Sequence, residues 1–91
     1  MHQTFGNEDH DADFTRWLTE HPDGYVLNHD HHPSRSYLVL HRATCYHWKG
    51  NRRWLASYSK TCADSISELQ DWAATSTGSS ELQRCAHCAP H

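Results

Sequence analysis

The sequence is poor in apolar side chains and has no hydrophobic run long enough to cross a membrane. Hydrophobic residues make up 36% of the 91 residues, whereas a membrane-spanning helix needs roughly 20 consecutive apolar residues. The first residues contain neither the basic segment nor the apolar segment of a secretory signal peptide. We therefore expect a cytoplasmic protein that makes no membrane contact.

Recognisable catalytic motifs are also missing. The chain has no GxSxG nucleophile motif, no HExxH motif and no glycine-rich phosphate-binding loop. We therefore predict that the protein is not an enzyme. A weaker alternative is a small metal-dependent hydrolase built on His29, Asp30, His31 and His32, but a solvated loop is the favoured interpretation because nothing in the sequence fixes the geometry of these residues.

Acidic residues are absent from the centre of the chain. Residues 1–30 carry seven acids and one base, residues 31–63 carry six bases and no acid, and residues 64–91 carry four acids and one base. This distribution favours a polyanion as the partner of the basic centre.

The pattern of elements predicts a single small α+β domain over residues 11–91, preceded by a flexible acidic arm at residues 1–10. Helices are expected at 11–21, capped by Asp11 or Asp13, and at 64–75, where Ser65 and Glu68 match a capping box. A short strand is expected at 25–28. Strands at 36–41 and 54–60 are expected to pair as a hairpin around the basic loop 46–53.

Cysteine pairs in a cytoplasmic protein indicate metal ligands or redox groups more often than disulfides. Cys85 and Cys88, spaced as Cys-x2-Cys, can direct two thiolates at one tetrahedral ion. Dithiol redox chemistry is disfavoured, because the pair does not open a helix after a strand as thioredoxin-like motifs do. The second half of the site is either His41 with Cys45 or Cys45 with Cys62. Both sets are closed, so we expect one structural zinc ion.

The stretches 37-YLVLHRATC-45 and 85-CAHCAP-90, with the helix between them, resemble the metal-binding domain of Ada-type DNA repair proteins and related zinc modules appended to nucleases. The resemblance covers residues 36–90 and implies His41, Cys45, Cys85 and Cys88 as the ligands. In that family the first cysteine of a Cys-x3-Cys pair accepts an alkyl group from the DNA backbone. This chain has His41 there, and an imidazole cannot act as that thiolate, so methyl transfer is not implied.

The resemblance and the basic centre together suggest a zinc domain that binds nucleic acid, with modified or damaged DNA as one target. Basic side chains neutralise phosphates and aromatic rings stack on bases. The alternative is a zinc-stapled protein-interaction module that uses the acidic arm. The candidate nucleic-acid contacts are Arg42, Tyr46, Trp48, Lys49, Arg52, Arg53 and Lys60.

Overall fold

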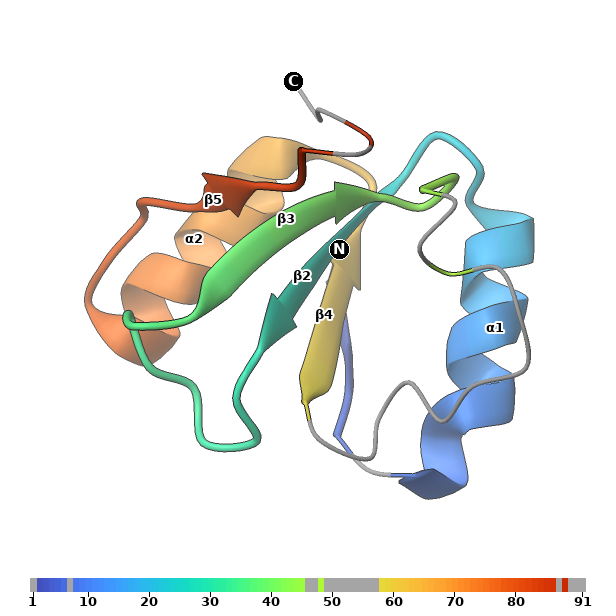
Figure 1. The fold of residues 1–91 in the computed structure, drawn as a ribbon, viewed down its shortest axis with the longest axis horizontal. Helices are drawn as coiled ribbons and strands as arrows, with labels where there is room; N and C mark the ends of the chain where they lie inside the picture. The colour runs from blue at the N-terminus through green and yellow to red at the C-terminus, as the bar shows by residue number, and fades with distance from the viewer. Residues whose placement is uncertain (1, 7, 46–47, 49–57, 87, 89–91) are drawn as a thin grey trace.

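A computed structural model describes residues 2–6, 8–45, 48, 58–86 and 88. Within these residues a five-stranded mixed sheet lies between two helices (Figure 1), which confirms the predicted α+β class. The sheet order is β1-β4-β2-β3-β5, with β5 parallel to β3 and all other pairs antiparallel. The elements are β1 Gln3–Phe5, a 3₁₀ turn Glu8–His10, α1 Asp11–Glu20, β2 Tyr25–His29, β3 Leu38–Arg42, β4 Ser59–Ala63, α2 Ile66–Thr77 and β5 Gln83–Arg84.

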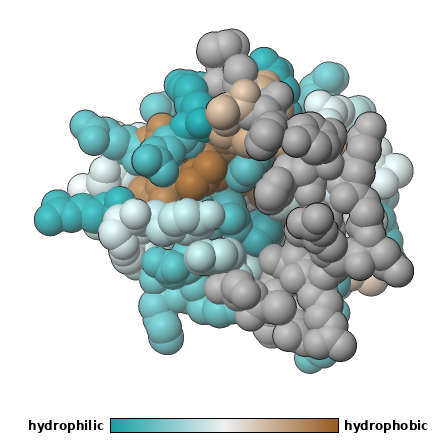
Figure 2. Space-filling model, viewed as in Figure 1, coloured by the Kyte–Doolittle hydropathy of each residue, from teal (hydrophilic) through white to brown (hydrophobic). Residues whose placement is uncertain are grey.

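Each face of the sheet is covered by one helix because the strands carry apolar residues at alternating positions on both faces. Leu27 and Leu40 pair across β2 and β3 and pack with Leu69 and Ala73 of α2. In the view of Figure 2, strongly hydrophobic surface is confined to a small area over β3, and most of the coloured surface around it is hydrophilic.

The opposite face packs against α1. Val26 of β2 lies beside Cys62 of β4 in the register, and both belong to a core with Phe14 and Trp17 of α1. Phe5 of β1 completes this side, with its ring centroid 5.8 Å from that of Phe14. Within the described residues, neither helix is long and apolar enough to cross a membrane.

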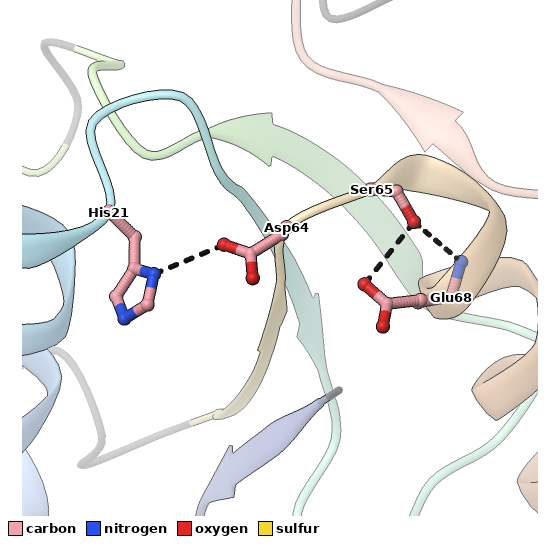
Figure 3. A network of polar contacts seen from close by, with 4 residues as sticks. All are labelled: His21, Asp64, Ser65 and Glu68. Atoms are coloured by element: carbon pink, nitrogen blue, oxygen red, sulfur yellow. Dashed lines mark hydrogen bonds and ion pairs between the residues drawn. The ribbon is translucent and has the colours of Figure 1, made fainter.

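The two helices begin differently. The backbone N–H of Glu68 donates to Oγ of Ser65, and that hydroxyl donates to the Glu68 carboxylate at 3.2 Å (Figure 3), which confirms the predicted cap of α2. Gly78 ends this helix at φ +81°, a conformation that favours glycine. The predicted cap of α1 was wrong. His10 precedes that helix without a side-chain cap bond, and Asp11 lies inside the first turn, where the helix dipole favours a carboxylate.

The predicted hairpin between residues 36–41 and 54–60 was also wrong. Strand β3 pairs with β2 and β5, and β2 separates it from β4. Both faces of β2 are apolar or buried, so it lies in the middle of the sheet rather than at an edge. The loop predicted at 46–53 lies outside the described residues except for Trp48, as do residues 54–57 of the predicted strand.

The arm predicted at residues 1–10 also differs from the structure. Gln3, Thr4 and Phe5 form an edge strand opposite Cys62, Thr61 and Lys60, because the Phe5 ring fills the core beside α1.

A hydrogen-bond chain runs through the interior between the sheet and α2. Nδ1 of His29 lies 2.8 Å from the carbonyl of Asp30, which can only accept, so this nitrogen carries the proton. Nε2 then accepts from the hydroxyl of Thr61 at 2.8 Å, and that oxygen lies 2.9 Å from the hydroxyl of Thr4. The His29 ring packs against Trp72 of α2, with centroids 4.5 Å apart. This arrangement fits a neutral imidazole, and burial lowers the pKa of His29, opposed mainly by its bond to the Asp30 carbonyl.

Replacing Ser65 with alanine is expected to lower the free energy of unfolding by about 1 kcal/mol, because the Glu68 N–H loses its side-chain acceptor. Chemical unfolding measures this change. Ser76→Ala, at an exposed position inside α2, is the matched control and should change stability little. Equal losses in the two variants would contradict the cap.

Acid is expected to destabilise the fold through His29. Its pKa in the folded chain lies below the ordinary 6.5, so the unfolded chain takes up this proton first as the pH falls. The part of the free energy of unfolding that depends on neutral His29 is fully present above pH 6.5. It is lost as the pH falls below 6.5, with a slope of up to about 1.4 kcal/mol per pH unit. Lys60, whose pKa is about 8, is protonated in both states there.

Urea unfolding at a series of pH values between about 7.5 and 5.5 tests this slope. His29→Gln should flatten it, whereas His32→Gln, at an exposed position, should leave it unchanged. The assignment fails if both variants keep the wild-type slope.

Candidate metal centre

Four potential metal ligands converge at one end of the sheet. They are His41, Cys45, Cys85 and Cys88, and their ligand atoms all lie within 4.8 Å of one another. The sulfurs of Cys45 and Cys85 are 4.0 Å apart. Within the part of the chain that the structure describes, this is the one group in which three or more such side chains meet.

The parallel pairing of β3 and β5 brings the ligands together. Strands β3 and β5 run in the same direction (Figure 1), so their carboxyl ends lie at the same edge of the sheet, and the ligands stand at or just beyond these ends. His41 lies in β3, and Cys45 follows it after a turn in which its N–H donates to the carbonyl of Arg42. Cys85 follows β5, and its N–H donates to the carbonyl of Leu40 at 2.9 Å.

Arg42 holds Cys88 through two hydrogen bonds. Its backbone N–H donates to the Cys88 sulfur at 3.2 Å, and its Nε donates to the Cys88 carbonyl at 3.0 Å. A donor directed at the sulfur stabilises a thiolate more than a thiol. Cys88 is the least buried of the four ligands, so these bonds fix the one ligand that packing constrains least.

Trp48 holds His41. The two rings meet edge to face with centroids 4.7 Å apart, and the indole N–H donates to the carbonyl of Arg42 at 3.0 Å. The other side of the indole contacts Phe14 of α1 in a T-shaped pair. The imidazole is therefore positioned by a buried aromatic ring that is itself fixed to β3 and α1. The sequence analysis missed this role and that of Arg42; the position of Trp48, three residues after Cys45, was the available signal.

The donor set and spacing fit one metal ion. A tetrahedral zinc ion with Zn–S bonds of about 2.3 Å places its sulfurs about 3.8 Å apart. The observed separation of Cys45 and Cys85 is close to this value. A disulfide has an S–S distance of about 2.05 Å, and none of the four cysteines forms a disulfide in this structure. The cluster can therefore hold a metal ion without rearrangement of the strands.

Cys62 is not part of the cluster. It lies in β4 between its partners Gln3 of β1 and Val26 of β2, fully buried in the core on the α1 side. Burial raises the pKa of its thiol, opposed by the charge of Lys60, so the thiol is protonated at neutral pH. The four-thiolate alternative does not match this arrangement, and His41 takes the fourth position in the cluster.

Two of the predicted nucleic-acid contacts are interior residues. Trp48 and Lys60 are 7% and 2% exposed. Burial lowers the pKa of Lys60 to about 8, opposed by the charge of Asp11, and its Nζ donates to the Tyr58 carbonyl at 3.4 Å. These side chains are needed by the core, which corrects their assignment to a binding surface. Arg42 is partly buried in its contact with Cys88, and Tyr46, Lys49, Arg52 and Arg53 lie outside the described residues.

The histidine loop does not gather into a metal site within the described residues. His29 is committed to Thr61 and the Asp30 carbonyl, and Nδ1 of His31 lies 2.8 Å from the hydroxyl of Ser59. His32 is exposed. This arrangement gives no support to a hydrolase built on these residues.

Comparison of the chain with family models, curated proteins and solved structures gave no match. The assignment of a metal site therefore depends only on the geometry of the four side chains. The resemblance to the Ada-type metal-binding domain stays a prediction.

His41→Ala and Cys62→Ala are expected to separate the two ligand sets. His41→Ala removes a ligand and should weaken zinc binding by at least about tenfold, measured by competition with a chelating dye. Cys62→Ala should keep the wild-type affinity, although its small cavity lowers stability. Circular dichroism of both variants controls for folding. Loss of zinc from Cys62→Ala with retention by His41→Ala would restore the four-thiolate set.

Proposed function

We propose that this chain is a small binding domain whose fold is held together by one structural zinc ion at His41, Cys45, Cys85 and Cys88. The observation that carries the proposal is the convergence of these four ligands at one end of the sheet. Three soft sulfurs and one imidazole suit zinc better than the harder magnesium or calcium ions. Four protein ligands leave no open position for water, so the ion would be structural rather than catalytic.

The zinc ion would join the segment that follows β3 to the segment that follows β5. Cys45 and Cys85 are 40 residues apart, and strand β5, which precedes the second pair of ligands, is only two residues long. A cross-link across a segment of this length restricts the unfolded chain. The free energy of metal binding also adds directly to the free energy of folding, because the unfolded chain has no preformed site. This stabilisation suits a chain of 91 residues with a small apolar fraction.

The partner that the charge distribution favours is nucleic acid, contacted by the segment at residues 46–53. This segment contains Tyr46, Lys49, Arg52 and Arg53 and belongs to the stretch 31–63 that has no acid. In the sequence it directly follows the ligand Cys45 and precedes β4, which starts at Ser59. The Ada resemblance supports a nucleic-acid backbone as the partner and modified or damaged DNA as one target.

The zinc ion is tested by intact mass under native and then denaturing conditions. The native mass should exceed the denatured mass by one zinc ion, and the denatured chain should carry four free thiols. A denatured chain lighter by four protons, with no metal, would indicate two disulfides and overturn the zinc centre.

Nucleic-acid binding is tested with the zinc-loaded protein and a short DNA duplex at several salt concentrations. The double variant Arg52→Ala and Arg53→Ala should weaken binding and reduce the salt dependence, by about 0.9 in the logarithmic slope for each phosphate that the variant no longer neutralises. Arg84→Ala, at an exposed position in β5, is the matched control. Salt-insensitive self-association without DNA binding would favour the protein-interaction alternative and leave the zinc result standing.

A further inference from the structure

We propose a second site, separate from the zinc centre: a pocket on α2 that receives a lysine or arginine side chain of a partner protein. The pocket has a volume of about 470 Å³. It is lined by His2, Glu68, Asp71, Trp72, Thr75 and Ser76. None of these residues belongs to the metal cluster or to the basic segment at residues 46–53.

The helical repeat of α2 places the pocket residues on one face. Glu68, Asp71, Trp72, Thr75 and Ser76 follow the spacing i, i+3, i+4, i+7 and i+8, which is a single stripe along two turns. Leu69 and Ala73, which form the neighbouring stripe, are fully buried against the sheet. His2 lies directly before β1 and borders the pocket. The pocket is therefore built on rigid elements rather than on loops.

Trp72 supplies an aromatic surface at the pocket. Its side chain is partly buried, and its ring packs on the buried imidazole of His29 with centroids 4.5 Å apart. The contact with His29 fixes the indole before any ligand arrives, and a fixed aromatic ring is the preferred partner of an ammonium or guanidinium group.

Two carboxylates set the charge of the ligand. Oε2 of Glu68 accepts a hydrogen bond from Ser65, which orients this side chain at the start of α2. Asp71 is exposed, and no described residue forms an ion pair with it. Among the described residues, no lysine or arginine lines the pocket. An anion would be repelled here, and a neutral ligand would cover the Asp71 carboxylate without compensating its charge.

The remaining lining groups suit the same ligand. Thr75 and Ser76 have hydroxyl oxygens that can accept from the several N–H donors of a guanidinium or ammonium group. The pocket lies along an exposed helix surface rather than inside an enclosed cavity, which suits a side chain that projects from another protein. Charge complementarity, the fixed indole and these acceptors thus favour a basic side chain of a protein partner.

The test uses the zinc-loaded full chain and short acetylated, amidated glycine-serine peptides with one central arginine, lysine or citrulline. Citrulline has the shape of arginine without its charge. Amide shifts of residues 68–76 in two-dimensional NMR report binding at the pocket. The arginine and lysine peptides should bind, and the citrulline peptide should bind at least about threefold more weakly.

Two variants and one control test whether the peptides bind at the pocket. Asp71→Asn and Trp72→Leu should each weaken arginine-peptide binding by at least about twofold to threefold. Glu20→Gln removes one exposed carboxylate from α1 and should leave binding unchanged. Asp71→Asn is decisive if Trp72→Leu does not fold, because Asp71 is exposed and supports no core contact.

Equal binding of the arginine and citrulline peptides, or wild-type binding by Asp71→Asn, would overturn the proposal. Butylammonium tests the source of the cation. If it binds as tightly as the lysine peptide, the pocket takes free small amines and the protein partner is wrong. These outcomes do not depend on DNA binding, so they are distinguishable from a failure of the proposed function.

Discussion

Four donor atoms, from two segments 40 residues apart, lie within 4.8 Å of one another where β3 and β5 end. The rest of the structure depends on this convergence. Strand β5 has only two residues, and its pairing with β3 is too short to hold the C-terminal segment alone. The Arg42 bonds to Cys88 and the Cys85 bond to Leu40 bring the ligands into place. Metal coordination would then add a further constraint at this short edge of the sheet.

Trp48 connects the ligand cluster to the rest of the core. Its ring contacts the imidazole of His41 on one side and Phe14 of α1 on another, and the ammonium group of Lys60 lies 5.8 Å from its centroid. A buried lysine is costly unless its charge is compensated, and here two aromatic rings and a carbonyl lie near it. The core on this side is thus partly polar, and its packing depends on a ring that also positions a ligand.

Local signals in the sequence predicted the parts of the fold that depend on local interactions. The start of α2 follows from Ser65 and Glu68, and the ligands Cys85 and Cys88 follow from their Cys-x2-Cys spacing. Cys45 was common to both predicted ligand sets. Strand pairing depends on residues distant in the sequence, so the position of β2 between β3 and β4 could not be derived from the turn signals around residues 46–53. Lys60 illustrates the same limit. Its charge predicts an exposed side chain. It is an interior residue because β4 is buried on both faces of the sheet.

The proposed zinc centre would contribute to the proposed binding of nucleic acid without contacting it. An ion with four protein ligands has no position for a substrate, so its effect on a partner must pass through the chain that it holds. The chain leaves the cluster at Cys45, is fixed once more at Trp48, and joins the sheet again at Ser59. Most of the basic segment lies between these two fixed points. Fixing both ends reduces the conformational entropy that binding would otherwise cost. The proposed zinc ion would therefore raise affinity for a polyanion by restraining the basic segment, not by direct contact.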